Sequence, residues 1–300
     1  MLRCAFLTLG DSTGFVIDDE LAYPPLAALG WRVEAISWRS PTCDWRAYDA
    51  VVIRSTWDYI SDPEAFLAVL AEIERADTPL FNALDFVRWN IRKTYLRDLA
   101  GRGVPVVPTI WREQLVPGEL SALMDEIGSD EVVIKPIVGL NAQGVFRVNA
   151  RNDRMPAAEL CAHYAEREFM AQPFLSQVTS EGEFSLCYFN GELSHAILKT
   201  PKAHDFRVQE EHGGVIRAVE AGSELRAAGE MALRALGSVP LYARADFVRA
   251  NDVPGFWLME LELIEPSLYL RMDAGAPERF AQALHKRASS AFAESGGGQG

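Results

Sequence analysis

The first 90 residues alternate short apolar runs with stretches in which apolar residues recur every three or four positions. The apolar runs have the length of buried strands, and the stretches between them have helical spacing. We expect strands at Cys4–Leu9, Arg32–Ile36, Ala50–Ile53 and Pro79–Ala83, and helices at Asp18–Leu29 and Asp62–Arg75. Strands that alternate with helices form parallel sheets, so this part predicts a small doubly wound α/β domain.

The remainder of the chain has a mixed pattern typical of an α+β arrangement. Asn190-Gly191 lies between two alternating runs, which is a strong indication of an antiparallel hairpin. The expected strands are Glu131–Pro136, Val145–Val148, Phe169–Leu175, Glu183–Tyr188, Leu193–Lys199, Tyr242–Val248 and Trp257–Ile264. The expected helices are Asn90–Gly101, Glu119–Ile127, Ala157–Arg167, Ser223–Leu236 and Pro277–Phe292, with an extended segment at Val104–Thr109.

Charge and length narrow the class of protein. The 300 residues contain 42 acidic and 29 basic side chains, a formal net charge of −13. Such a field repels phosphate backbones and anionic lipids, so we expect neither a nucleic-acid nor a membrane partner. No apolar run reaches the ~20 residues of a membrane span. The four cysteines are scattered, which favours reduced thiols in a cytoplasmic protein.

A lysine at a strand end precedes a turn rich in glycine. Lys135 closes the strand Glu131–Pro136, and Gly139–Gly144 separates it from the next strand. The ammonium group and the backbone N–H groups of such a hairpin tip can contact the same phosphate. The stretch is neither a Walker loop nor a dinucleotide fingerprint, and taken alone its glycines indicate an ordinary tight turn more often than a phosphate-binding lid.

Carboxylates recur at two neighbouring strands. Residues two apart in a strand share a face, so Asp246 shares one with Arg244, and Glu260 shares one with Glu262. Leu261 then faces a core. Paired carboxylates on adjacent strands suit Mg²⁺, which prefers oxygen ligands. The alternative is a solvated face whose acids form salt bridges with Arg244 and Arg271.

A group of cations accompanies these acids. Its members are Lys199, Lys202, Arg207 and Arg244, with His195 and His204 nearby in sequence. In an acidic protein, such a cluster can neutralise phosphates or a substrate carboxylate, although a solvated loop would have the same composition. Cys187 lies within a strand and not at a helix N-terminus, so it is a poor candidate nucleophile.

The order of these features resembles the ATP-grasp ligases, across about residues 85 to 270. In that family a first lysine lies in the helix that leads into the ATP-grasp region, and Lys93 matches it here. A second lysine precedes a glycine-rich lid, as Lys135 precedes Gly139–Gly144. Met170–Leu175 resembles the segment that holds adenine. Asp246 and Glu260 match metal ligands, and Glu262 stands where the family usually has asparagine.

The resemblance implies three parts, at residues 1–92, 93–175 and 176–300, with ATP and Mg²⁺ as cofactors. It implies an acylphosphate made from a substrate carboxylate, which an amine then converts to an amide. ATP contacts are expected from Lys93, Lys135, Gly139, Asn141, Gly144, Gln172, Phe174 and Glu183, and metal ligation from Asp246, Glu260 and Glu262. Lys199, Arg207 and Arg244 are the expected catalytic cations.

Within the family, Ile53–Tyr59 and Glu265–Tyr269 resemble the cycloserine-synthetase type, which cyclises O-ureido-D-serine in antibiotic biosynthesis. Arg54, Ser55 and Thr56 are then the expected contacts to a small amino-acid-like substrate. Three alternatives stay open, namely a glutathione-synthetase-like ligase joining two substrates, a kinase that stops at the phosphorylated product, and an ATP-binding sensor without catalysis. The surface composition also allows a homodimer.

Overall fold

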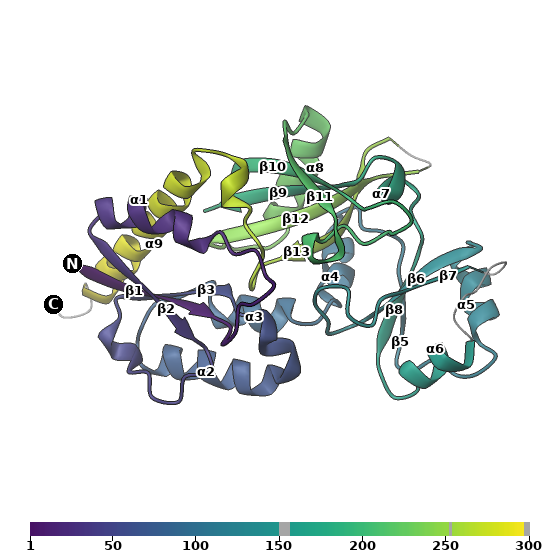
Figure 1. Ribbon diagram of the computed structural model, residues 1–300, viewed down its shortest axis with the longest axis horizontal. Coiled ribbons are helices and arrows are strands. Elements are labelled where there is room, and N and C mark those ends of the chain that lie inside the picture. The colour runs from purple at the N-terminus through teal and green to yellow at the C-terminus, as the bar shows by residue number, and fades with distance from the viewer. Residues whose placement is uncertain (150–156, 252–253, 297–300) are drawn as a thin grey trace.

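The computed structural model describes residues 1–149, 157–251 and 254–296. Within these residues the strands form three sheets, which Figure 1 shows as an N-terminal domain, a large central sheet and a smaller sheet at the opposite end. This mixture of helix and strand confirms the predicted α/β class. None of the helices in the described ranges combines the length and apolar character that a bilayer crossing requires.

The N-terminal sheet is parallel, as predicted, with strand order β2-β1-β3-β4. Its strands are β1 (Leu2–Thr8), β2 (Trp31–Ser37), β3 (Ala50–Ser55) and β4 (Leu80–Phe81). Helix α2 (Pro63–Arg75) covers one face, and α1 (Tyr23–Ala28) and α9 (Ala276–Gly296) cover the other (Figure 1). The closing helix of the chain therefore completes the N-terminal core, where Phe280 packs near Phe6.

A turn between two short helices follows this domain. The predicted helix Asn90–Gly101 is confirmed only from Tyr95 onward, because the structure has α3 (Leu84–Asn90) and α4 (Tyr95–Gly101) with a turn between them. In the turn, the Lys93 backbone N–H donates to the Ile137 carbonyl at 2.8 Å. The stretch lacks proline or glycine at the break, so tertiary hydrogen bonds, not local propensity, end the first helix.

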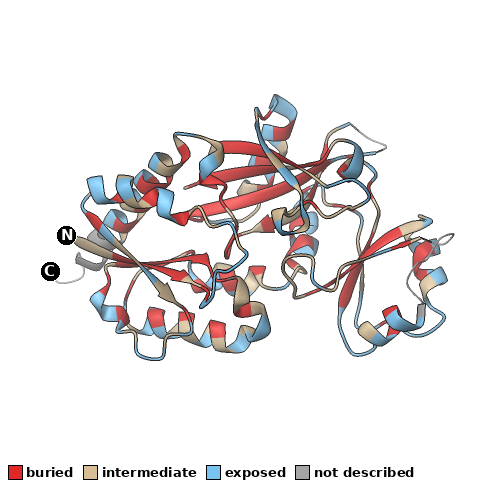
Figure 2. Cartoon of the chain, viewed as in Figure 1, coloured by how far each residue is buried: buried red, intermediate tan, exposed pale blue. Residues whose placement is uncertain are grey.

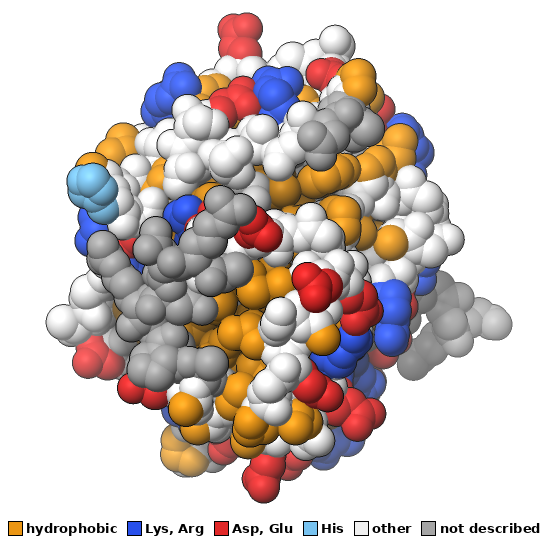
Figure 3. All heavy atoms as spheres, turned by 90° about the vertical axis from the view of Figure 1, so that its right-hand side faces the viewer, with side chains coloured by type: hydrophobic (Ala, Val, Ile, Leu, Met, Phe, Trp, Pro, Cys, Tyr) orange, Lys and Arg blue, Asp and Glu red, His pale blue; other side chains and the backbone are white. Residues whose placement is uncertain are grey.

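The smaller sheet, here called the lid sheet, has strand order β5-β8-β6-β7. It consists of β5 (Ile110–Arg112), β6 (Glu131–Pro136), β7 (Phe146–Asn149) and β8 (Phe169–Pro173), with helices α5 (Leu120–Ile127) and α6 (Ala157–His163). Strands β6 and β7 pair antiparallel, which confirms the predicted hairpin. Viewed from this end, hydrophobic side chains gather in the middle of the face, with charges of both signs around them (Figure 3).

The central sheet has strand order β11-β10-β9-β12-β13. Its strands are β9 (Glu183–Phe189), β10 (Glu192–Thr200), β11 (Val215–Val219), β12 (Tyr242–Arg249) and β13 (Phe256–Glu262). Helices α7 (Gln177–Ser180) and α8 (Ser223–Arg234) accompany it. Figure 2 shows β9, β12 and much of β10 as buried. Leu186 and Leu261 lie in the core beneath α8, as the strand alternation predicts for Leu261.

Strand β13 is at the edge of the central sheet, and the chain covers its outer side. The Leu258 N–H donates to the Pro105 carbonyl at 2.8 Å, and Val107 N–H donates back to Leu258 at 3.2 Å. The predicted extended segment Val104–Thr109 therefore pairs locally with β13. Covering an edge in this way satisfies its backbone groups and fixes the strand in place.

Candidate active site

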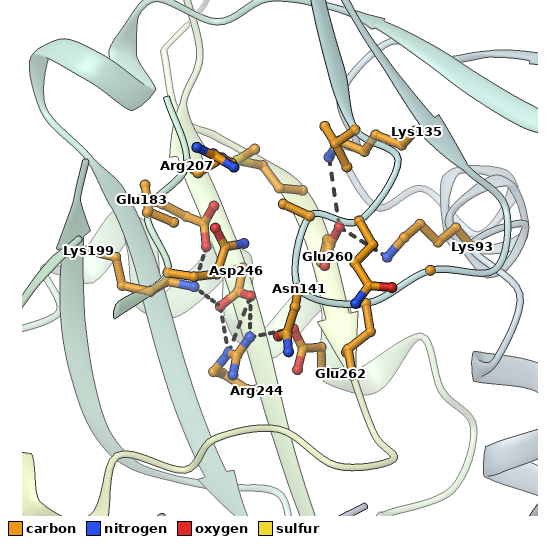
Figure 4. A pocket seen from close by; sticks show the side chains of 18 of the residues that line it. Lys93, Lys135, Asn141, Glu183, Lys199, Arg207, Arg244, Asp246, Glu260 and Glu262 are labelled. Carbon is orange, nitrogen blue, oxygen red and sulfur yellow. Dashed lines mark hydrogen bonds and ion pairs between the residues drawn. The ribbon is translucent and has the colours of Figure 1, made fainter. Parts of the chain in front are cut away.

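A cleft between the lid sheet and the central sheet holds most of the predicted site residues. Trp57 and Tyr59 of the N-terminal domain also line it. The predicted residues on its wall are Lys93, Lys135, Gly139, Asn141, Gln172, Phe174, Glu183, Lys199, Arg207, Arg244, Asp246, Glu260 and Glu262. Figure 4 shows cationic side chains approaching the carboxylates from both sides. Gly144 lines an adjoining cavity that shares Gly139 and Asn141 with the cleft.

Three carboxylates meet on one face of the β12–β13 pair. The antiparallel register places Asp246 opposite Glu260 and Arg244 opposite Glu262, so the predicted shared face is confirmed. One oxygen each of Asp246, Glu260 and Glu262 lies within 4.8 Å of the others. Three closely spaced oxygen donors are a donor set that fits Mg²⁺.

Glu260 lies between two lysines that come from different elements. Lys93 Nζ is 3.1 Å from Glu260 Oε1, and Lys135 Nζ is 3.7 Å from the same atom (Figure 4). Burial alone would raise the pKa of Glu260, but the two ammonium groups outweigh it and lower that pKa. Burial lowers the pKa of Lys135, and the nearby Lys93 lowers it further, against the opposing effect of Glu260. Lys93 and Lys135 therefore concentrate positive charge at one point of the cleft. Phosphate oxygens could replace Glu260 as the partner of both ammonium groups.

Asp246 is the most firmly held of the three acids. It accepts hydrogen bonds from Ser185 Oγ at 2.5 Å and from Arg244 Nε at 3.0 Å, and Lys199 Nζ lies 3.4 Å away. Burial opposes its ionisation, but Arg244 and Lys199 lower the pKa of Asp246 overall. Lys199 also pairs with Glu183. A buried charge is tolerated when it is paired in this way, and Asp246 remains an ionised oxygen donor.

Glu262 occupies the position where asparagine was expected from the family pattern, and Arg244 compensates for the difference. The Arg244 Nη2 group donates to Glu262 Oε1. Burial raises the pKa of Glu262 to about 7, although Arg244 opposes this, and Asp246 and Glu260 raise it further. Arg244 thus links two of the three candidate metal ligands and holds them on one face.

The outer part of the cleft is apolar and suits a flat aromatic base. Its wall includes Val107, Val133, Leu175, Val178 and Met259. The predicted adenine segment Met170–Leu175 consists of β8 and the residues directly after it. There, Gln172 Nε2 donates to Thr109 Oγ1 at 2.9 Å, and the Arg147 guanidinium lies 3.6 Å from the centre of the Phe174 ring. This arrangement fixes the two residues that were predicted to hold adenine.

The hairpin tip forms a tight turn over the cleft. Asn141 and Ala142 have left-handed backbones, with φ of 51° and 56°, and Gly144 has φ of 69°. A Cβ atom on Gly139 would lie 2.7 Å from Pro136 Cγ, so the close fold of this turn requires glycine there. The Asn141 carbonyl lies 3.3 Å from His212 Nε2 of the opposite wall.

The predicted substrate residues Arg54, Ser55 and Thr56 are buried at the end of β3 and do not line the cleft. Arg54 Nε donates to Asp19 Oδ1 at 3.0 Å, and its Nη2 donates to the Pro266 carbonyl at 3.1 Å. Arg54 therefore lies behind the wall and supports a loop there. Of the predicted cations, Arg207 reaches the cleft and pairs with Asp205.

The supported loop, here called the 264–268 loop, follows β13 directly. Each of its five consecutive carbonyl oxygens lies within hydrogen-bond distance of a different side chain, in chain order Tyr242, Trp57, Arg54, Arg244 and His195. The loop presents Glu265, Ser267 and the adjoining Tyr269 to the cleft. Sequence reasoning assigned no role to these residues or to Tyr59. The Ile53–Tyr59 and Glu265–Tyr269 segments were nevertheless singled out by resemblance.

Two family models match separate stretches of the chain. Residues 4–82 match the family model of the N-terminal domain of D-cycloserine synthetase DcsG. Residues 110–263 match that of the ATP-grasp domain of prokaryotic glutathione synthetase. The cycloserine biosynthesis protein DcsG of Streptomyces lavendulae is 33% identical over 300 residues, which cover 92% of this chain and 96% of that protein. A glutathione synthetase of Ralstonia nicotianae is 25% identical over 223 residues, 74% of this chain and 65% of that protein.

Solved structures agree with this assignment. The crystal structure of D-cycloserine synthetase DcsG superposes with a TM-score of 0.81 and 31% identity, covering 95% of this chain and 99% of that one. A D-alanine–D-alanine ligase from Bacillus anthracis shares the fold, with a TM-score of 0.68 and 14% identity, covering 98% of this chain and 100% of the other. The resemblance seen in the sequence is therefore confirmed, and this chain belongs to the ATP-grasp family as an ATP-dependent ligase.

Proposed function

We propose that this ligase closes O-ureido-D-serine to D-cycloserine. The observation that carries the proposal is the match of residues 4–82 to the DcsG N-terminal domain. This domain contributes Trp57 and Tyr59 to the cleft. The ATP-grasp domain model of glutathione synthetase matches residues 110–263, which follow this domain. The family model that matches the N-terminal domain is thus that of the cycloserine enzyme.

The charged groups of the cleft suit a phosphoryl transfer. We assign Asp246, Glu260 and Glu262 to Mg²⁺, which would neutralise charge on the phosphate oxygens when bound. Lys93 and Lys135 would then exchange Glu260 for phosphate oxygens. ATP would place its base in the apolar part of the cleft beside Gln172 and Phe174, with Glu183 toward the ribose and the 139–144 hairpin over the phosphates.

The reaction requires positioning more than covalent help from the protein. The substrate carboxylate attacks the γ-phosphate, giving an acylphosphate and ADP. The nitrogen bonded to oxygen in the ureido group then attacks the acyl carbon and phosphate leaves, which closes the ring. Water then cleaves the bond between the ring nitrogen and the carbamoyl carbon, and the carbamoyl group leaves as carbamate, which decomposes to carbon dioxide and ammonia. Lys199, Arg207 and Arg244 would balance the negative charge that develops. The closed hairpin would exclude water, which otherwise hydrolyses the acylphosphate.

Incubation of the enzyme with ATP, Mg²⁺ and O-ureido-D-serine tests the proposal. We expect ADP, phosphate and a cyclic product lighter than the substrate. AMP and pyrophosphate would refute the acylphosphate route, and ADP without an amide would indicate a kinase. A requirement for a second amino acid would instead support a ligase of the glutathione-synthetase kind. All four cysteines are free thiols, and we place the enzyme in the cytoplasm, where thiols stay reduced.

A further inference from the structure

Glu265 is a buried acid on the wall of the cleft that the assignments above leave without a role. It follows the candidate metal ligand Glu262 by three residues and lines the same cleft. Its side chain is only 5% exposed. Within the part of the chain that the structure describes, its Oε2 atom has no hydrogen-bond partner. A buried carboxylate oxygen without a donor is costly, so the site is incomplete without a ligand that supplies one.

The charge balance of the cleft indicates what that ligand carries. Glu183, Asp246, Glu260 and Glu262 each have a lysine or arginine within 4 Å. Among the residues described, Glu265 is in no such pair. A cationic donor would supply both the hydrogen bond that Oε2 lacks and the ion pair that the other four acids have.

The carboxylate is held in place from the N-terminal domain. Trp57 Nε1 donates to the Glu265 carbonyl at 2.9 Å, and Arg54 donates to the next carbonyl along. Tyr59 favours the ionised form of Glu265, because it lowers the pKa of that carboxyl against the effect of burial. The Tyr59 ring stacks on Phe66 with ring centres 4.8 Å apart. The backbone that carries Glu265 is therefore held at the wall of the cleft, where the residue is buried.

We infer that Glu265 binds the α-ammonium group of an amino-acid substrate whose carboxylate reacts beside Arg244 and the metal ligands. The nitrogen of an α-amino acid is two bonds from its carboxyl carbon, so both groups can be held by neighbouring walls of one cleft. Glu265 is then a specificity residue that selects α-amino acids over simple carboxylic acids. The inference rests on the proposed function and names the feature of the substrate that the cleft recognises.

The test compares two ligands on the wild type and two variants. Glu265→Gln removes the charge with little change in shape, and Glu181→Gln makes the same change at the surface ion pair with Arg249. We expect Glu265→Gln to raise the KM for O-ureido-D-serine about 100-fold while the KM for ATP and the kcat change little. Glu181→Gln should match the wild type. For the analogue that lacks the α-amino group, wild type and Glu265→Gln should have equal KM values.

Two results would overturn the inference. One is an equal loss of affinity for both ligands, and the other is a fall in kcat with unchanged KM, which would make Glu265 a base. The wild type provides a test that does not depend on folding of the variant, since it should favour the amino compound about 100-fold over its deamino analogue.

If the wild type does not accept O-ureido-D-serine, the proposed function fails, but the role of Glu265 can still be tested. Calorimetry with ADP and Mg²⁺ would then compare D-alanine with propanoate and D-serine with 3-hydroxypropanoate. A preference for the amino member that Glu265→Gln abolishes supports the role of Glu265. The absence of such a preference in both pairs would refute it.

Discussion

Asn90 couples the stability of the fold to the geometry of the metal ligands. Its side chain bonds to the outer edge of β13, where Nδ2 donates to the Leu261 carbonyl at 2.8 Å and Oδ1 accepts from the Leu263 N–H at 2.9 Å. Glu262 lies between these two residues, and Glu260 precedes them. The Asn90 side chain therefore makes the hydrogen bonds that a neighbouring strand would make with β13. This part of β13 carries Glu260 and Glu262, two of the three candidate metal ligands.

Asn90→Ala removes both hydrogen bonds and leaves a buried carbonyl and a buried N–H without partners. Each unsatisfied group costs about 1–3 kcal/mol, so we expect the free energy of unfolding to fall by about 2–6 kcal/mol. Loosening of β13 should also raise the Mg²⁺ concentration for half-maximal activity by about tenfold, the usual effect of losing a residue that orients a ligand.

Urea unfolding followed by tryptophan fluorescence measures the first effect, and a Mg²⁺ titration of ADP release measures the second. Asn251→Ala is the matched control, because Asn251 is exposed at the far end of β12. The control should change neither quantity. A variant Asn90→Ala with a wild-type urea midpoint would show that β13 does not depend on this amide. A lower urea midpoint with unchanged Mg²⁺ dependence would show that the stability of β13 and the geometry of the metal ligands are independent, and would refute the coupling.

Three further changes test other parts of the structure. Lys135→Met should lower kcat/KM by about 100-fold or more with an unchanged circular dichroism spectrum, because it removes a phosphate-binding cation. Burial lowers the pKa of His195, so the folded state resists protonation and the free energy of unfolding should fall as the pH drops below about 6.5. Calorimetric melting from pH 7 to pH 5 should show a smaller decrease in melting temperature for His195→Gln than for the wild type. Gly229→Ala would push a methyl group into Tyr188 and should destabilise the fold by about 1–3 kcal/mol in urea, whereas Gly101→Ala has open space.

Local patterns were sufficient for the elements whose ends carry their own stop or start residues. Asp62, where the predicted helix begins, caps α2 by accepting the Ala65 N–H at 3.1 Å, and Pro63 occupies the first turn. Gly128 ends α5 with φ of 73°. Strand alternation was also enough to place Asp246, Glu260 and Glu262 on one face, because a period of two is fixed by backbone geometry.

Features that depend on distant contacts were not visible in the sequence. The break before Lys93 is set by a hydrogen bond to Ile137, 44 residues later. Strand β11 was missed because it is an edge strand with exposed positions such as Val215, and it lacks the apolar pattern of a core strand. Arg54 was expected to touch substrate. Only the fold shows that its partners are Asp19 and the Pro266 carbonyl, behind the wall of the cleft.

The glutamate at position 262 is best understood through Arg244. An asparagine at this position would be neutral, so glutamate adds a negative charge beside Asp246 and Glu260. Arg244 donates to both Asp246 and Glu262, and it can do so because the strand register places it next to each of them. The extra charge is thus paired within the sheet itself. This pairing leaves no cation for Glu265 among the described residues, and in our proposal the α-ammonium group of the substrate supplies that charge.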